Sequence, residues 1–264
     1  MDLIELKALI VNTEFFFYNF YLGVVRDIKY DSRLNQFILY FYDNSDKKYI
    51  SYAYMFNYYI NRLKMIRMLI LKKRNIQNLV HFTPLSNLES ILNNGFFSRN
   101  SLDFLGYDFS YTDEYRIDNK LDFICNSITF PNYKMFYSKR KDDPSCKWAI
   151  LSIDSEILID KFNTEFYRFN ASSGDESKCR FDPCSNYALE DMFYPEDREP
   201  DLPSNYTTNP QAEVLIKDYI DTSYIKCIDT LKFDSNVNSL AKNFNVDYNP
   251  ESNLFTYRKD YKRW

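Results

Sequence analysis

The sequence predicts an α+β chain, in which a larger domain, residues 78–264, follows a small β-rich and helical appendage, residues 1–77. Three patterns support this prediction. Residues 21–54 alternate apolar and polar side chains around a turn, residues 79–95 have the pattern of a strand followed by a short helix, and residues 212–216 alternate again. A chain of 264 residues is long enough to bury a core in such an arrangement.

The composition is that of a globular protein, with 45% hydrophobic and 27% charged residues. The net charge of -4 gives no global attraction to phosphate, so any nucleic-acid contact would depend on a local basic patch. The 24 Tyr and 23 Phe residues fit either a codon bias or a stacking surface for bases, and the codon bias explains most of this enrichment.

The cysteines indicate a reducing compartment. They are five, an odd number, and none is spaced as CxxC, so we expect neither a zinc site nor a disulfide framework. The sequence shows no secretory leader and no apolar run long enough to cross a bilayer. We therefore expect a cytoplasmic protein with no membrane association.

The appendage is predicted to be a small antiparallel meander followed by a helix. Strand-like runs cover residues 21–30, 36–42 and 48–54. Apolar residues then recur at near-helical spacing between Phe56 and Ile70, and the basic cluster Lys72–Arg74 follows. Two roles remain open for this region: it supports the main domain, or it guides nucleic acid or binds a partner.

The main domain begins with a strand, a turn and a helix. Pro84 can open the helix, apolar residues repeat at helical spacing after it, and Gly95 ends it. The turn carries His81, the one histidine of the chain, close to the hydroxyl of Thr83 and the amide of Asn87. Such a cluster of polar groups at a helix start is suited to binding a polar ligand.

The rest of the domain alternates irregular segments with buried strands. We expect an irregular segment at 101–115, strands at 121–130 and 148–153, a short helix near 156–160, and a long acidic loop at 172–209. The loop leads into a strand that carries Glu213, and strand alternation would place Gln211 on the same face.

Two segments, HFTPLSNLESILNNGFFSR at 81–99 and NPQAEVLI at 209–216, together with Arg116, resemble the DarT family of nucleic-acid ADP-ribosyltransferase toxins. The resemblance runs from about Asn78 to about Leu231 and includes the strings WAILSID and FYRFNASSGD. It implies an ADP-ribosyltransferase fold of two small packed β-sheets with flanking helices. It also implies NAD as the substrate that supplies ADP-ribose.

The resemblance implies that Glu213 is catalytic. Breaking the bond between nicotinamide and ribose leaves positive charge on the ribose, and a fixed carboxylate stabilises that charge more in the transition state than in the ground state. Without the resemblance, a glutamate at a strand edge facing solvent is the commoner arrangement.

The same resemblance assigns NAD-binding residues. It places His81, Thr83 and Asn87 against NAD, and it places Arg116 near the NAD phosphates and the reactive centre, where it would also serve catalysis. Arginine suits that position because its guanidinium binds phosphate and stays charged. Arg99 competes with Arg116 for this assignment.

Acceptor binding is expected near the loop. The resemblance implies that Gln211 reads the edge of the acceptor base and that Asn170 and Ser172 belong to a substrate-covering loop. The acidic residues of this loop do not suit a phosphate backbone, so two other roles stay open for it: a surface that faces an antitoxin, and a lid that moves. The basic run Lys139–Lys141 offers a phosphate-binding rail, together with the chain's basic C-terminal tail or with Lys72–Arg74.

The function implied is that of a bacterial toxin that transfers ADP-ribose from NAD to a nucleobase of single-stranded DNA or RNA, in a toxin–antitoxin or phage-defence system. Its partner would be an antitoxin with a macrodomain. An enzyme that modifies protein and a catalytically silent nucleotide- or partner-binding module remain alternatives.

The glycines are too far apart for a Rossmann or P-loop motif, and no metal is expected because the lone histidine has no ligand-spaced companions.

Overall fold

A computed structural model describes residues 14–17, 20–31, 36–42, 50–51, 53–107, 109–110, 120–161, 163–171 and 179–260. The chain divides into two compact units, Met1–Ile66 and Arg67–Trp264. The division between the units falls within helix α2 (Ala53–Arg74). The buried Arg67 belongs with the second unit, because its guanidinium donates to the carbonyl oxygen of Leu158 at 2.7 Å.

The first unit contains a four-stranded antiparallel sheet. Its strands follow chain order: β1 (Glu14–Phe17), β2 (Phe20–Asp31), β3 (Gln36–Tyr42) and β4 (Ile50–Ser51). This is the meander predicted from the alternation of apolar and polar residues. Strand β1 was not predicted.

The second unit is built on a seven-stranded mixed sheet in the order β13-β12-β8-β5-β7-β10-β9. Its strands are β5 (Asn78–Pro84), β7 (Phe123–Ile128), β8 (Trp148–Asp154), β9 (Thr164–Tyr167), β10 (Glu213–Lys217), β12 (Ile225–Thr230) and β13 (Asp247–Pro250). The pair β12–β13 is parallel, and the other pairs are antiparallel. Strands β6 (Phe96–Phe97) and β11 (Tyr219–Ile220) form a separate two-stranded sheet.

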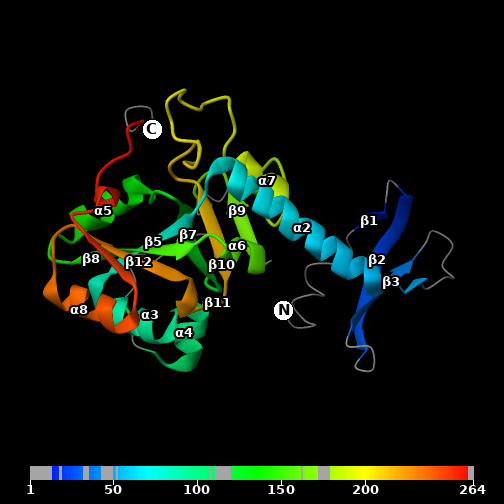
Figure 1. Ribbon diagram of the computed structural model, residues 1–264, viewed down its shortest axis with the longest axis horizontal. Helices are drawn as coiled ribbons and strands as arrows, with labels where there is room; N and C mark the ends of the chain where they lie inside the picture. Colours follow the sequence, from blue (N-terminus) through cyan, green and yellow to red (C-terminus); the bar gives the residue numbers. More distant parts are fainter. Residues whose placement is uncertain are drawn as a thin grey trace. The chain divides into compact units, whose positions relative to one another are not determined.

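Helices cover this sheet, which confirms the α+β class. They are η1 (Leu85–Asn87), α3 (Leu88–Asn94), α4 (Arg99–Leu105), α5 (Tyr133–Asp142), α6 (Ile157–Asp160), α7 (Asn186–Asp191), η4 (Thr222–Tyr224), α8 (Ser235–Phe244) and η5 (Asn253–Phe255). In the view of Figure 1, α3, α4 and α8 lie below the central strands, and α5 and α7 lie above them. Among the described residues, no helix has the length and hydropathy needed to cross a bilayer.

Helix α4 corrects the prediction of an irregular segment from residue 101. The hydroxyl of Ser98 caps the helix by accepting from the backbone N–H of Ser101. Gly106 ends it with a left-handed backbone, at φ 69°. These two caps define the helix although its apolar residues show no clear helical period.

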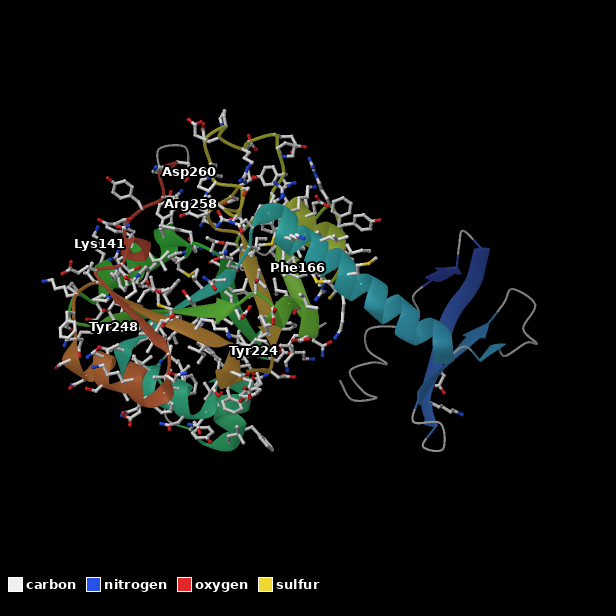
Figure 2. The ribbon with its side chains drawn as sticks, in the orientation of Figure 1. Lys141, Phe166, Tyr224, Tyr248, Arg258 and Asp260 are labelled. Carbon is white, nitrogen blue, oxygen red and sulfur yellow. The ribbon has the colours of Figure 1, made fainter. Side chains whose placement is uncertain are left out.

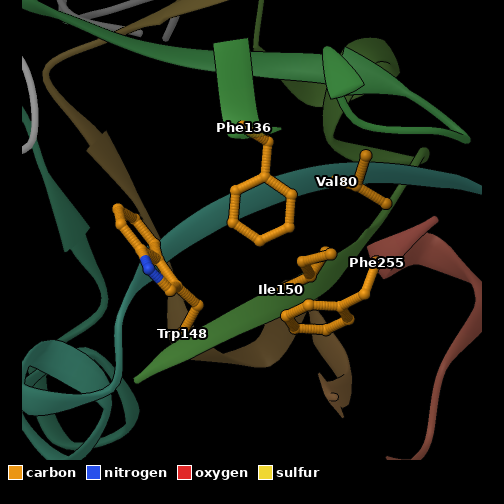
Figure 3. Packing of buried hydrophobic residues seen from close by; sticks show 5 residues of the cluster. All are labelled: Val80, Phe136, Trp148, Ile150 and Phe255. Atoms are coloured by element: carbon orange, nitrogen blue, oxygen red, sulfur yellow. The ribbon is translucent and has the colours of Figure 1, made fainter. Parts of the chain in front are cut away.

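The core on one side of the sheet is aromatic. Figure 3 shows Val80 of β5, Trp148 and Ile150 of β8, Phe136 of α5 and Phe255 of η5 packed together. Strand β8 is buried along residues 148–153 because it lies between β5 and β12. A strand covered on both faces needs an almost continuous apolar run, which the string WAILSI supplies.

The sheet opens between its two central strands. Strand β5 pairs with β8 along its whole length, but its described pairing with β7 covers just Leu79 and Val80. After Val80 the two strands separate, while β7 stays paired with β10 through residues 123–126. The sheet therefore consists of two halves joined at a short seam, and the space beside that seam holds the candidate site.

Candidate active site

A cavity of about 230 Å³ lies where β5 and β7 separate. It is lined by the end of β5, by η1, α3 and the start of α4, by β7, and by the first turn of α5. His81 and Glu213 both line this cavity. These two side chains, which are 132 positions apart in the sequence, therefore line the same cavity.

Glu213 is a buried carboxylate at the first position of β10, with 6% of its surface exposed. Its Oε2 accepts a hydrogen bond from the backbone N–H of Ala171 at 3.0 Å. Its backbone is paired with Tyr167 of β9. A buried carboxylate is costly unless it is hydrogen-bonded, so this anchored anion fits a site that must stabilise positive charge.

The turn before β10 corrects one prediction. The side-chain oxygen of Asn209 accepts from the backbone N–H of Gln211 at 2.8 Å, and its carbonyl oxygen accepts from that of Ala212 at 3.1 Å. This Asx turn places Gln211 in a turn, and the strand begins two residues later at Glu213. The alternation expected to place Gln211 on the face of Glu213 therefore does not apply, and Gln211 is not among the described residues that line the cavity.

His81 has a defined tautomer. Its Nδ1 lies 2.7 Å from the carbonyl oxygen of Cys125 on β7. A carbonyl oxygen can only accept, so Nδ1 carries the proton and, in the neutral ring, Nε2 is an acceptor. The edge of the ring also packs against Phe96, at 5.0 Å between ring centroids. The imidazole thus spans the opening between the two halves of the sheet in one orientation.

Thr83 and Asn87 line the cavity and contact one another. The side-chain amide of Asn87 donates to Thr83 Oγ1 at 3.1 Å and to the carbonyl oxygen of Ser110 at 2.7 Å, and it accepts from the N–H of Ser110 at 2.9 Å. Both ends of this amide are therefore engaged. In this structure Asn87 holds residue 110 against the rim of the cavity.

The remaining predicted site residues are divided. Asn170 lines the cavity and directly precedes Ala171, whose N–H binds Glu213. Arg116 and Ser172 lie outside the described residues. Arg99, the competitor of Arg116, is half-buried and is the one cationic side chain among the described lining residues.

A second polar cluster, which the sequence did not reveal, joins Lys120 to strand β9. Lys120 binds the carboxylate of Glu165 and the hydroxyl of Tyr167, and Tyr167 donates to Glu165 at 2.7 Å. Tyr167 is the backbone partner of Glu213. The alternation of Glu165 and Tyr167 along β9 was the signal that could have placed both on one face. The cluster holds Lys120 against β9, the strand beside the candidate catalytic residue.

Ion pairs neutralise several carboxylates of the acidic loop. Several of its carboxylates face cations, in the pairs Arg168–Asp191 at 3.3 Å, Arg180–Glu196 at 3.2 Å and Lys73–Glu190 at 2.6 Å. These pairs neutralise charge that would otherwise repel a phosphate backbone. The objection that the loop raises to a nucleic-acid substrate is correspondingly weaker.

The basic run on α5 is partly structural. Arg140 donates from Nη2 to the carbonyl oxygen of Phe255 at 3.0 Å, and its guanidinium lies 4.6 Å from the ring centroid of Phe136. Burial lowers the pKa of Arg140 from its ordinary value. In the other predicted basic cluster, Arg74 lies over the ring of Phe193. Both arginines thus hold elements together.

Among the described residues, no group of three or more His, Cys, Asp or Glu side chains is placed to hold a metal ion.

Comparisons with known proteins give the family. The family model described as "ssDNA thymidine ADP-ribosyltransferase, DarT" matches residues 80–249, which is more than half of the chain. No match was found among curated proteins.

Three solved structures are similar. The structure "Thermosipho africanus DarTG in complex with ADP-ribose" has 19% identity to this chain and a TM-score of 0.45. The match covers 68% of this chain and 51% of that one, so this chain spans about half the length of that protein. "Thermus sp. 2.9 DarT in complex with NAD+" has 14% identity and a TM-score of 0.46, and covers 68% of this chain and 98% of its own. "Thermus sp. 2.9 DarT in complex with ADP-ribosylated ssDNA" has 13% identity and a TM-score of 0.48, and covers 69% and 97%. The family match confirms the resemblance seen in the sequence, and the chain belongs to the DarT family of ssDNA thymidine ADP-ribosyltransferases.

Proposed function

We propose that this protein cleaves NAD and transfers ADP-ribose to a nucleobase of single-stranded DNA, with thymine as the base that its family membership favours. The observation that carries the proposal is the placement of Glu213 and His81 in one cavity, where each is held by a backbone hydrogen bond. Single-stranded RNA is the second acceptor to be tested.

Glu213 supplies the electrostatic part of the proposed mechanism. When the bond between nicotinamide and ribose breaks, the electron pair leaves with nicotinamide, and positive charge develops on the ribose. The carboxylate of Glu213 stabilises that charge without reorganising, because the N–H of Ala171 already fixes one of its oxygens. A ring nitrogen of the base then bonds to the anomeric carbon, and its proton passes to Glu213, the one carboxylate among the described lining residues.

His81, Thr83 and Asn87 are the proposed contacts of NAD on the first strand and turn. The acceptor nitrogen of neutral His81 is suited to a ribose hydroxyl, which donates to it. Arg116 remains our proposal for the second catalytic residue and for a phosphate contact, and Arg99 is the cation that the described cavity already contains. Asn170, Ser172 and Gln211 remain proposed contacts of the acceptor.

We infer that the two halves of the seven-stranded sheet correspond to the two packed sheets of an ADP-ribosyltransferase fold. The short seam between β5 and β7 supports this, because it lets one half turn away from the other. We also propose that residues 1–77 form an appendage to a catalytic domain of residues 78–264. The protein would act as a toxin in growth arrest or phage defence, restrained by an antitoxin that carries a macrodomain.

The function is tested by incubating the protein with adenine-labelled NAD and matched oligonucleotides: DNA with thymine, DNA without thymine, and RNA. Label that nuclease releases as a modified thymidine, identified by mass spectrometry, supports the proposal. Label that only protease releases would support the protein-modifying alternative. A folded protein that releases no nicotinamide would instead be the catalytically silent binding module.

A further inference from the structure

Asn132, the residue before α5, has a buried side-chain donor with no partner. The residue is 2% exposed. Its Oδ1 accepts from the backbone N–H of Met135 at 3.2 Å, and its own N–H donates to Ser127 Oγ at 3.2 Å. Because Oδ1 is committed to the helix cap, the orientation of the amide is fixed. Its Nδ2 is buried without any hydrogen-bond partner, an arrangement that destabilises a fold unless something else meets the donor.

The helix that Asn132 caps presents an uncompensated positive end to the cavity. Helix α5 has ten residues, its first turn contains no acidic side chain, and its last turn carries the basic residues Lys139–Lys141. Asn132 and Met135, both at the start of this helix, line the cavity. A helix N-terminus attracts negative charge, because its first backbone N–H groups have no partner within the helix.

The turn that leads into α5 is strained. Thr129, a β-branched residue, has φ 62°, and the N–H of Phe130 reaches back to the carbonyl oxygen of Ile128 at 2.6 Å. The N–H of Thr129 also donates to the carbonyl oxygen of Asn78 on β5. Strain of this kind persists where the surrounding structure imposes it, often beside a functional site. Here the tight turn carries the chain from the end of β7 directly to Asn132 at the cavity wall.

We propose that Asn132 and the first turn of α5 form an oxyanion subsite of the cavity, which receives a phosphoryl oxygen of a substrate. The inference rests on the proposed function, which supplies two sources of that oxygen: the diphosphate of NAD and the phosphodiester of the acceptor strand. A phosphoryl oxygen fits better than a neutral carbonyl oxygen, because the helix end adds a favourable interaction with negative charge.

Access to the subsite requires a small movement. Nδ2 of Asn132 is shielded from solvent, so a ligand reaches it only after the groups that cover it have moved. Met135 lines the same cavity, and its long unbranched side chain can adapt to a ligand. The amide and the helix end would then face the ligand together.

The test uses a variant that keeps the cap. Asn132→Asp retains an oxygen to cap Met135 but replaces the donor with a second anionic oxygen, so binding of a phosphoryl ligand should fall about 10- to 100-fold. Asn132→Ser also keeps a capping oxygen and should give a smaller loss in the same direction. The matched control is Ser185→Asp, which likewise places a capping carboxylate at the start of a helix, α7, where Ser185 accepts from Ala188. Melting temperatures verify that all three variants are folded.

Binding is measured by calorimetry with ADP-ribose, with nicotinamide riboside, which has no phosphate, and with an oligonucleotide. Loss confined to ADP-ribose assigns the subsite to the diphosphate of NAD, and loss confined to the oligonucleotide assigns it to the acceptor strand. If the folded Asn132→Asp and Asn132→Ser variants bind both ligands as the wild type does, the subsite is refuted and the proposed function stands. If the wild type binds neither ligand, the proposed function fails and the subsite fails with it.

Discussion

Breaking one buried ion pair should unfold the second unit at a markedly lower temperature. Arg258 and Asp260 lie side by side near the C-terminus (Figure 2), with Nε to Oδ1 at 3.0 Å and Nη2 to Oδ2 at 2.5 Å. Their side chains are just 1% and 3% exposed. Arg258→Met leaves the Asp260 carboxylate buried without its partner, which should cost about 3–5 kcal/mol. For a unit of this size that corresponds to a melting temperature lower by about 6–20 °C.

The control for this prediction removes both charges. Arg258→Met/Asp260→Leu leaves no unpaired charge, so its free energy of unfolding in urea should return to within about 1–2 kcal/mol of wild type. A single variant that loses less than about 1 kcal/mol, or a double variant as unstable as the single one, would refute the reasoning.

The same pair also supports the candidate site. Arg258 donates to Thr207 Oγ1 at 3.5 Å and to the carbonyl oxygen of Thr208 at 3.4 Å. Thr207 in turn donates to the carbonyl oxygen of Asn209, the residue that forms the turn before Glu213. Loss of Arg258 should therefore lower transfer activity even at temperatures where the variant is folded, and activity assays below its melting temperature check this.

Further predictions concern Asn87 at the cavity rim, the thiol of Cys227, and the two glycines Gly95 and Gly106. Asn87→Ala removes three hydrogen bonds at the cavity rim and should raise KM for NAD about 5- to 100-fold in steady-state assays, while an unchanged KM would count against a role in NAD binding. Burial and neighbouring carboxylates raise the pKa of the Cys227 thiol to about 12, so mass spectrometry should find it unalkylated by iodoacetamide at pH 8.5. Its contribution to stability should be lost as pH rises from 9 towards 12, because the unfolded thiol ionises first. Gly95→Ala should destabilise the fold by more than about 2 kcal/mol, since its Cβ would lie 2.5 Å from the carbonyl oxygen of Ile220. Gly106→Ala, in open space at a similar φ, should cost about 1 kcal/mol. Equal losses of stability in the two variants would exclude the steric explanation.

Local patterns in the sequence predicted the elements whose signal is local. Strand β5 and helix α3 followed from apolar spacing and from Gly95, which closes the helix with φ 86°. Helix α4 was not predicted, because its apolar residues show no clear helical period, although Ser98 and Gly106 mark both of its ends. The Asx turn at Asn209 was missed for a similar reason, since a side chain that binds its own backbone does not disturb alternation.

The cavity depends on contacts between distant segments. The separation of β5 from β7 arises because β5 pairs fully with β8, and no periodicity within β5 records that choice. The unpartnered amide of Asn132 is likewise invisible in sequence, because Asn before a helix is ordinarily just a cap. That Glu213 and His81 belong to one site was predicted from the family resemblance rather than from either residue alone.

The most direct test of the account is Glu213→Gln, which keeps an oxygen to accept from the N–H of Ala171 but removes the negative charge. We predict that nicotinamide release from NAD, with an acceptor oligonucleotide present, falls on the order of 100- to 1,000-fold, while ADP-ribose binding and melting temperature stay close to wild type. Nicotinamide release at the wild-type rate would contradict the claim that this carboxylate drives the reaction.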